Sequence, residues 1–204
     1  ALTKVLGGVP DKALLAKEEL VTPDSTNGGI VLVGSHVNKT TQQLEELKNC
    51  KFPIAFIEFD QHLVVTPEGL QPEVERVVKL AEECIKNGQT VAVFTRRDRF
   101  DLPTEDKDEQ LKISVKISDA VTSIIGKLSM RPGFIIAKGG ITSSDVGIKA
   151  LKVKKALVMG QIKPGVPVWM TGEESKFPNM PYIIFPGNVG AVTTLREAVE
   201  TLMQ

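Results

Sequence analysis

Strand-like apolar runs alternate with helical patterns along most of this chain, and the alternation limits the fold more than any other feature. The main runs cover residues 30–33, 54–59, 90–94, 134–138 and 156–160, with shorter ones at 166–169 and 182–185. Continuous apolar runs of this length are typical of strands that are buried on both faces of a sheet. We therefore predict an α/β fold, a three-layer domain with a largely parallel or mixed central sheet and helices on both faces.

Helices are predicted between these runs from their apolar spacing and their terminal residues. Pro72 suits the first position of one helix, and Asn87 with Gly88 is a typical helix end. The other helices are expected over residues 39–47, 108–128, 142–151 and 193–203. Pro167 lies inside its own run, which indicates an edge strand because proline cannot donate a ladder hydrogen bond.

The first 29 residues differ in pattern from the rest of the chain. Residues 11–20 are compatible with a short helix or with an arm of apolar spacing, and a loop rich in Pro, Asp, Ser, Asn and Gly follows. We predict an N-terminal arm or linker with a short helix over residues 1–29 and one domain over residues 30–204. A chain of 204 residues is long enough to bury a core without staples.

Charge and composition exclude several classes of function. The 25 Lys and Arg residues balance the 25 Asp and Glu residues, and no basic patch with interleaved aromatic residues occurs, so we expect no nucleic-acid partner. No apolar stretch approaches about 18 residues and the chain opens on no secretory-signal pattern, so we expect no membrane association. The two cysteines lack CxxC spacing, which indicates a reducing, cytoplasmic location. His36 and His62 lack metal-type spacing, so no metal ligands are predicted.

Glycine-rich or polar segments follow four of the predicted strands. They are Gly34-Ser35-His36, Thr95-Arg96-Arg97, Gly139-Gly140-Ile141-Thr142 and Gly187-Asn188-Val189-Gly190. Ligands of open α/β sheets bind beyond the carboxyl ends of the strands, so we expect these segments at one shared edge of the sheet.

Residues 139–144 have the composition of an anion site. The two glycines let the backbone approach a ligand, and the helix start that follows offers unpaired N–H donors. The hydroxyl groups of Thr142, Ser143 and Ser144 can cap the helix or donate to phosphate oxygens. The same pattern is compatible with an ordinary strand–helix turn that has a good N-cap.

Taken together, these segments resemble the C-terminal, nucleotide-binding domain of the four-carbon acid sugar kinases. The matching stretches are Val33–His36 with Lys39–Gln42, Phe94–Arg96, Lys138–Asp145, Gly160–Trp169 and Phe185–Gly190. They follow the order of that family and cover residues 30–204. The resemblance implies ATP-dependent phosphorylation of an acid sugar such as threonate, erythronate or an oxo-tetronate, with ATP and Mg²⁺ as the implied cofactors.

The same resemblance assigns the nucleotide contacts residue by residue. By this resemblance, Ser35 would contact ATP, and the turn on the phosphate side would be formed by Gly139, Gly140, Ile141 and Thr142. The backbone at Gly187 would approach the nucleotide closely. The family's N-terminal domain, which carries the acid-sugar site and an Asp-rich motif, has no counterpart here. The sequence therefore resembles the ATP-binding half of a kinase, which reaches its sugar acid through a missing N-terminal domain, and no catalytic residue is identified. Several branches of this family have an acidic residue where this chain has Ile141. The resemblance therefore does not indicate which acid sugar is the substrate.

Several residues keep two interpretations. Lys138 could pair with phosphate or lie at a solvated strand edge, and Arg96 could clamp phosphate or belong to a surface cluster. Asp145 could lie in the first turn of its helix, where its charge is favourable to the helix dipole, and magnesium binding is the second interpretation. Trp169 could stack on adenine or anchor an interior or an interface. The oligomeric state is open, and a homodimer is compatible with the sequence.

Two other functions compete with the kinase interpretation. The first is a non-catalytic module that binds a nucleotide or an acidic ligand within a multidomain protein. The second is a dinucleotide-dependent oxidoreductase domain, which is disfavoured because no Gly-x-Gly-x-x-Gly follows the first strand.

Overall fold

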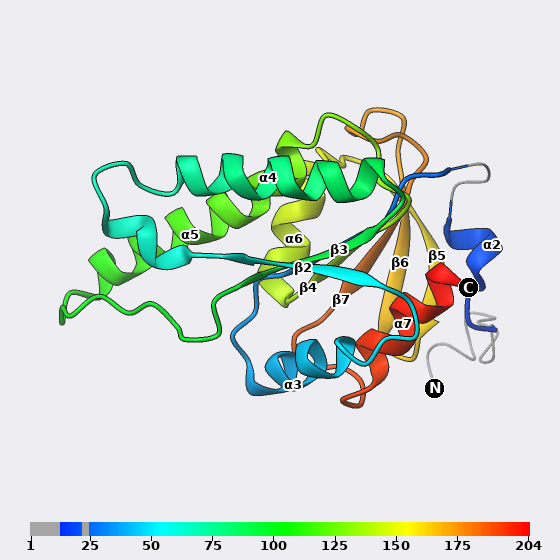
Figure 1. Ribbon diagram of the computed structural model, residues 1–204, viewed down its shortest axis with the longest axis horizontal. Helices are drawn as coiled ribbons and strands as arrows, with labels where there is room; N and C mark the ends of the chain where they lie inside the picture. Colours follow the sequence, from blue (N-terminus) through cyan, green and yellow to red (C-terminus); the bar gives the residue numbers. More distant parts are fainter. Residues whose placement is uncertain (1–12, 22–24) are drawn as a thin grey trace, which may run out of the picture.

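The central sheet has seven strands in the order β2-β3-β1-β4-β7-β6-β5. In the computed structural model, which describes residues 13–21 and 25–204, they are β1 Ile30–Val33, β2 Ile54–Phe59, β3 Thr90–Thr95, β4 Ile135–Lys138, β5 Ala156–Lys163, β6 Val166–Thr171 and β7 Pro181–Phe185. The strands from β2 across to β7 pair in parallel, whereas β6 runs antiparallel to both β7 and β5 (Figure 1). The predicted mixed, largely parallel sheet is therefore confirmed.

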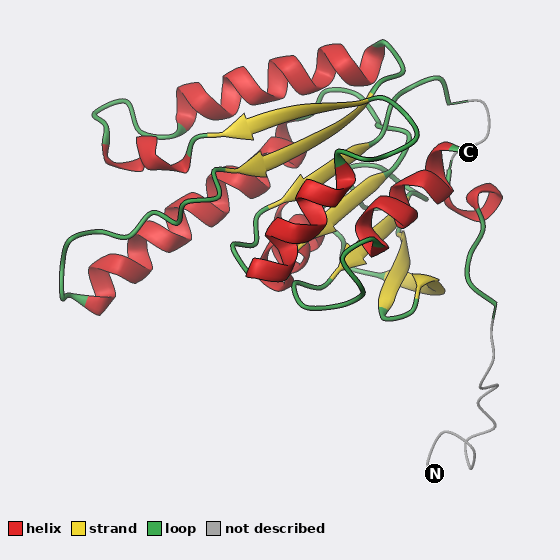
Figure 2. Cartoon of the chain, turned by 60° about the horizontal axis from the view of Figure 1, so that its bottom comes forward, coloured by secondary structure: helices red, strands yellow, loops and turns green. Residues whose placement is uncertain are grey.

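Helices cover both faces of this sheet, so the predicted three-layer architecture is confirmed (Figures 1 and 2). They are α2 Lys17–Leu20, α3 Asn38–Leu47, α4 Gln71–Lys86, α5 Lys107–Lys127, α6 Gly140–Asp145 and α7 Thr194–Met203, with a 3-10 turn at Gln61–Val65 and a π-helical turn at Val146–Ala150. Helices α4, α5 and α6 lie on one face, and α2, α3 and α7 lie on the other. In β1, Ile30 and Leu32 face the first layer, and Val31 and Val33 face the second. Both faces of β1 are buried, which explains its continuous apolar run.

Helix α5 is the longest helix of the described chain, and one end of it projects past the sheet (Figure 1). The carboxylate of Asp106 caps that end by accepting from the backbone N–H groups of Asp108 and Glu109. Leu111 and Val115, which follow on the projecting part, remain exposed. Among the described helices, none combines the length and the apolar character that a bilayer crossing requires.

Two sequence predictions are corrected by the structure. The helix after β4 begins at Gly140 rather than Thr142, because its N-cap is Gly139 and not a hydroxyl residue. Pro167 is not on an edge strand, since β6 lies between β7 and β5. The ladder between β6 and β7 pairs only Val168 to Met170, and the β5–β6 register shifts between Gln161 and Lys163. Pro167 therefore pairs with Gln161 beside a register shift of β5 and lies outside the β6–β7 ladder, which is where proline is tolerated in a sheet.

The described part of the predicted arm packs onto the domain. The helix expected over residues 11–20 is shorter, because α2 covers only Lys17–Leu20, and residues 11 and 12 lie outside the described residues. Leu15 and Leu20 are buried in the core beneath α3 and α7. The N–H of Leu15 donates to the carbonyl of Gln161 on β5 at 2.9 Å. The division between an arm and a domain at residue 29 remains a proposal.

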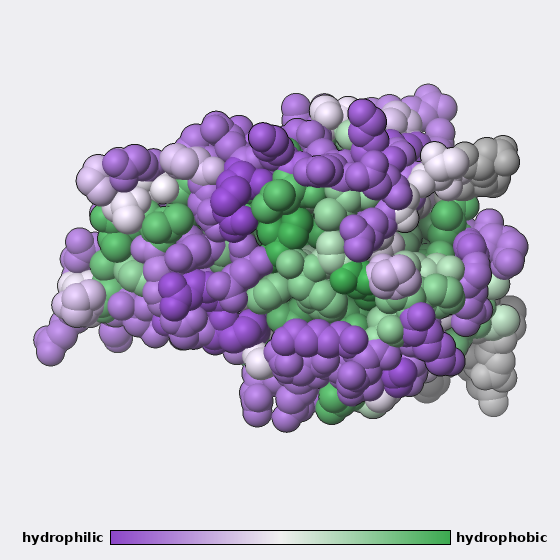
Figure 3. Space-filling model, viewed as in Figure 1, coloured by the Kyte–Doolittle hydropathy of each residue, from purple (hydrophilic) through white to green (hydrophobic). Residues whose placement is uncertain are grey.

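Strand β2 lies at one edge of the sheet, and α4 partly closes its free side. Apolar side chains gather over β2 between α4 and α3 (Figure 3), where residues 54–56 are half-buried. The guanidinium of Arg76 donates to the carbonyl of Glu58 at 2.7 Å, and the carboxylate of Glu73 accepts from the N–H of Asp60 at 2.8 Å. These bonds occupy backbone groups that an open edge would offer to another chain.

Candidate functional site

Strands β1 and β4 are neighbours, and the helices that follow them leave toward opposite faces of the sheet. Strand β1 leads into α3 and β4 leads into α6, so a crevice opens beyond the carboxyl ends of these strands. The N–H of Gly34 donates to the carbonyl of Lys138 at 3.3 Å and holds the two strand ends together. A crevice at such a switch point is the usual ligand site of open α/β sheets.

A cavity of about 910 Å³ lies at this crevice and collects the predicted strand-end segments. Its walls are Gly34–Val37, Gln61, Thr95, Arg97, Arg99, Phe100, Ser114, Ile117, Ser118, Val121, Gly139–Thr142 and Pro186–Val189. The expected convergence on one edge is thus confirmed. All six residues predicted as nucleotide contacts line this cavity, although their roles remain predictions. No Asp or Glu side chain is among the lining residues.

The first glycine of the pair, Gly139, carries the unusual backbone conformation. Its φ is +124°, a region that side-chain-bearing residues rarely adopt, and its N–H donates to the carbonyl of Phe185 at 2.8 Å. A Cβ on Gly139 would lie 3.0 Å from the Cβ of Ser35. Gly140 is different, because it is exposed, has no positive φ, and a Cβ there would meet nothing within 4 Å. The geometry therefore requires glycine at residue 139, whereas Gly140 borders open space in the cavity.

The hydroxyl groups after the glycines do not cap α6 as the sequence suggested. The hydroxyl of Ser143 donates back to the carbonyl of Gly139 at 2.7 Å, Thr142 packs against Gly34, and Ser144 is exposed. No side chain of the described residues caps the start of this helix. The first N–H groups of a helix have no partner within it, so those after Gly139 remain available to a ligand.

The β7 end of the cavity is held in place by α3. The hydroxyl of Thr40 donates to the carbonyl of Gly187 at 3.2 Å, and the amide of Gln43 donates to the carbonyls of Val189 and Ala191 at 3.0 and 2.8 Å. Across the crevice, the hydroxyl of Ser35 lies 3.5 Å from where a Cβ on Gly187 would stand. The ends of β1 and β7 therefore face each other at close range.

Lys138 is buried behind the Pro186–Gly187 turn that follows β7, and it is not at a solvated strand edge. Its ammonium donates to the carbonyls of Pro186 and Gly187 at 2.6 and 2.9 Å and lies 4.3 Å from the centre of the Phe185 ring. It is fully buried and does not line the cavity, so it has no direct path to a ligand phosphate. Burial, together with the charge of Lys39, lowers the pKa of Lys138 to about 8.

The arginine that reaches the cavity is Arg97, whereas the sequence had singled out Arg96. The guanidinium of Arg97 donates to the carbonyl of Ser35 at 2.6 Å and to the hydroxyl of Thr41 at 2.9 Å, which leaves its buried Nη1 without a partner in the described chain. Arg96 instead pairs with Asp98 at 2.9 Å outside the cavity. Both arginines lie in the loop after β3, and sequence alone could not decide which one faces the cavity.

His36 and Gln61 support the loop that carries Arg97. The Nε2 of His36 lies 3.0 Å from the carbonyl of Arg96, and the amide of Gln61 donates to that carbonyl at 3.1 Å and to the carbonyl of Asp98 at 2.9 Å. Burial lowers the pKa of His36, with a further contribution from the charge of Arg97, so this imidazole is neutral at neutral pH. No motif of the sequence points to Gln61, which is only 1% exposed and holds this loop in place.

Two other residues with open roles lie outside the cavity. The carboxylate of Asp145 accepts from Ser118 at 3.2 Å and pairs with Lys149 at 3.0 Å, so it is not directed at the glycine turn. Trp169 packs against the core cluster beneath α4 and α5, as an interior anchor. Within residues 13–21 and 25–204, no group of three or more His, Cys, Asp or Glu side chains could hold a metal ion.

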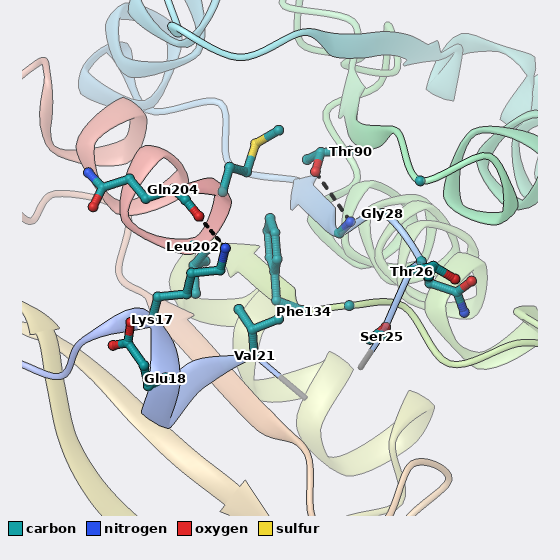
Figure 4. Close-up of a pocket in the computed structure, with 15 residues that line it drawn as sticks. Lys17, Glu18, Val21, Ser25, Thr26, Gly28, Thr90, Phe134, Leu202 and Gln204 are labelled. Atoms are coloured by element: carbon teal, nitrogen blue, oxygen red, sulfur yellow. Dashed lines mark hydrogen bonds between the residues drawn. The ribbon is translucent and has the colours of Figure 1, made fainter. Parts of the chain in front are cut away.

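A second cavity, of about 620 Å³, lies at the other end of the strands from the first cavity, near the amino ends of β1, β3 and β4. Figure 4 shows that Lys17 of α2 extends toward the backbone carbonyl of Gln204, to which it donates. The hydroxyl of Thr90 accepts from the N–H of Gly29, and the ring of Phe134 closes one wall. These contacts join the arm, the last helix and the sheet, and they favour a structural role for this cavity.

Comparison with protein families identifies the chain. The family described as the nucleotide-binding C-terminal domain matches residues 30–195, which include every strand of the sheet. The chain therefore belongs to this family of nucleotide-binding domains. No curated protein matches the chain significantly.

Solved structures with the same fold are about twice as long as this chain. A candidate tRNA synthase from Salmonella typhimurium LT2 aligns with a TM-score of 0.65 and 16% identity, over 88% of this chain and 41% of its own. A domain of unknown function from Bordetella bronchiseptica, solved with bound citrate as a domain-swapped dimer, aligns with a TM-score of 0.65 and 18% identity, over 86% of this chain and 41% of its own. At these identities the similarity shows the fold alone. The chain thus spans about 41% of the length of these structural relatives.

Proposed function

Since the chain belongs to a family of nucleotide-binding domains, we propose that it is the ATP-binding half of a kinase that phosphorylates a four-carbon acid sugar. The acceptor would be of the threonate, erythronate or oxo-tetronate type. The observation that carries the proposal is the meeting of Ser35, the 139–142 turn and Gly187 in one cavity at the switch point of the sheet.

The phosphates would lie against the turn between β4 and α6. The open space beside Gly140 and the uncapped helix start would let backbone N–H groups reach phosphate oxygens at about 2.9 Å. The hydroxyl of Ser35 would face the nucleotide from one side of the cavity, and the backbone of Gly187 would face it from the other side. Arg97 and Arg99 would add positive charge in a cavity that no carboxylate lines. Phosphoryl transfer asks a protein chiefly for such positioning and charge stabilisation.

Mg²⁺ would enter bound to the phosphates rather than to protein ligands. The described residues offer no cluster of three or more His, Cys, Asp or Glu side chains, and the cavity walls supply hydroxyl groups and N–H donors instead. Mg²⁺ is commonly held through substrate phosphates and water, so the donor set of this cavity fits the metal–nucleotide complex and not a separate metal site. When bound, the ion would neutralise charge on the phosphate oxygens.

The acceptor and its base would come from a second domain or chain. A kinase needs a group that receives the acceptor's hydroxyl proton, and no carboxylate lines this cavity. At the rim, Ile141 is 73% exposed and Val37 is 41% exposed, which leaves apolar surface that a covering domain would bury. The chain's span of about 41% of its structural relatives leaves room for such a domain.

A non-catalytic module that binds a nucleotide or an acidic ligand is the second candidate. The lack of a carboxylate in the cavity favours it, because binding requires no base. Calorimetric titration of the chain with Mg-ATP, ADP, NAD and citrate separates the candidates, with a kinase assay on a sugar acid in parallel. We expect weak binding of the adenine nucleotides and no turnover by the chain alone.

Addition of an acid-sugar-binding partner domain should then restore phosphorylation. Binding of citrate without ATP or ADP would favour the acidic-ligand module, and binding of neither would reject both candidates. Turnover by the purified chain, shown to be free of any copurifying partner, would contradict the half-enzyme assignment.

A further inference from the structure

Lys138 is a fully buried cation that has no anionic partner in the described chain. Its ammonium contacts two backbone carbonyls and the face of an aromatic ring, and no carboxylate acts on it by charge. A buried charge is costly unless it is paired, and carbonyl oxygens provide only part of the compensation. An ordinary core would place an apolar residue at this position of the strand.

The groups packed around Lys138 do not neutralise it. The residues beside it in the sheet, Val33 on β1 and Phe185 on β7, are apolar. From α3, Lys39 acts on it as a second positive charge. The region behind the glycine turns therefore has excess positive charge.

We propose that Lys138 is a positioning residue of the nucleotide site, which fixes the Pro186–Gly187 turn from behind and takes its counter-charge from the phosphates of the bound nucleotide. The inference rests on the proposed function, because it requires an anion in the cavity. Lys138 would act through the carbonyls of Pro186 and Gly187 rather than by touching the ligand.

This arrangement couples nucleotide binding to protonation. Without a ligand, burial and the charge of Lys39 lower the pKa of Lys138 to about 8. An anion nearby favours the protonated ammonium and raises this pKa, so binding at about pH 8 should take up to roughly half a proton from the solvent. By the same linkage, nucleotide affinity should fall as the pH rises above about 8.

The test is calorimetric titration of Mg-ATP into the whole chain at about pH 8, in two buffers with different ionisation enthalpies. The wild type should show a buffer-dependent heat that corresponds to proton uptake, and Lys138→Met should lose it. At about pH 7 the Met variant should also bind about tenfold more weakly, because its turn is no longer fixed. Lys149→Met is the matched control, since Lys149 is an exposed lysine paired with Asp119 and Asp145. It should keep the wild-type heat and affinity.

Each other outcome has a defined meaning. Wild-type binding with no more proton uptake than Lys138→Met would overturn the inference and leave the proposed function standing. If ATP does not bind, the proposed function fails, and the titration is repeated with inorganic tripolyphosphate. Tripolyphosphate binding with proton uptake then supports the role of Lys138 toward another phosphate ligand, and no binding overturns the inference as well.

If Lys138→Met does not fold, an NMR pH titration of the Lys138 side chain in the wild type, with and without ligand, replaces the comparison with this variant. A pKa that rises with the ligand supports the inference, and an unchanged pKa overturns it.

Discussion

Thr142 packs against Gly34 so closely that a Cβ on Gly34 would lie well under 3.0 Å from the Thr142 hydroxyl oxygen. Gly34 directly follows β1, and Thr142 belongs to the first turn of α6. The contact therefore brings together the two segments that diverge to opposite faces of the sheet. It leaves no room for a side chain at residue 34, which explains the glycine there without any appeal to positive φ.

The first prediction tests this contact. Gly34→Ala should destabilise the domain by about 1–3 kcal/mol, because the added methyl overpacks a filled space. Combining it with Thr142→Ala should recover part of that loss, with a coupling energy on the order of 1 kcal/mol. Urea unfolding of the two single variants and the double variant measures the coupling. Gly126→Ala in α5 is the control, since its Cβ would meet Ala150 only at ordinary contact distance and should not destabilise the domain.

The second prediction separates the roles of the two adjacent glycines. Gly139→Ala should lower the free energy of unfolding by about 1–3 kcal/mol, because Gly139 has a φ of +124°. Gly140→Ala should leave stability unchanged or slightly raised, since its conformation is helical and its Cβ would meet nothing. If Gly140 borders the phosphates, its alanine variant should nevertheless lose ATP binding. Thermal melts together with ATP titration measure both effects. Unchanged ATP affinity in a folded Gly140→Ala protein would mean that the nucleotide lies elsewhere.

The third prediction concerns the hydroxyl of Thr142. Thr142→Val keeps the side chain's shape and removes only its oxygen, so the packing on Gly34 should persist. ATP affinity should fall by less than in Gly140→Ala, because the backbone donors of the turn remain available. Calorimetric titration of both variants under one set of conditions makes the comparison. A larger loss in Thr142→Val would assign the main phosphate contact to the hydroxyl.

The strands could be predicted because burial on both faces leaves a clear trace in the sequence. Strands β1, β3 and β4 are nearly uninterrupted apolar runs, since their residues alternate between two cores. Pro167 was misplaced because local pattern carries no information on strand order. Its tolerance within β6 depends on a register shift against β5, which is a property of the pairing. The π-helical turn at Val146–Ala150 was likewise not predicted.

Side-chain direction was the main limit at the site. The six predicted nucleotide contacts could be placed in one cavity because strand ends converge by topology. Sequence could not show that Lys138 turns inward, since lysine at a strand end is usually solvated. The special backbone conformation could not be assigned to Gly139 rather than Gly140, because either glycine could adopt it.

The fourth prediction compares the two neighbouring arginines. Arg97→Gln should weaken ATP binding by about tenfold or more, because it removes a charge at the cavity and the contacts that hold Ser35 and Thr41. Arg96→Gln should change the affinity by less than about threefold, since Arg96 pairs with Asp98 away from the cavity. Titrations at low and moderate salt measure both, with thermal melts as folding controls. Equal losses in the two variants would indicate a general charge effect rather than a contact of Arg97.

The fifth prediction concerns stability at alkaline pH. Burial lowers the pKa of Lys138 from 10.5 to about 8, so between these values the unfolded chain binds a proton that the folded chain does not. Stability should therefore rise with pH across this window. The penalty for the buried charge is fully present below about pH 8 and fades as the pH approaches 10.5. At about 1.4 kcal/mol per pKa unit, the complete effect would be roughly 3 kcal/mol.

Urea unfolding of the wild type and of Lys138→Met, from about pH 7 to about pH 10, isolates this contribution. Methionine cannot titrate, and the carbonyls that it leaves unpaired cost the same free energy at every pH. Tyr182, whose pKa burial also raises, is common to both proteins and cancels in the difference. The wild type should therefore gain stability relative to the variant as the pH rises. A difference that stays constant over this range would mean that Lys138 keeps an ordinary pKa in the folded protein, and its charge would then need no counter-ion from a bound nucleotide.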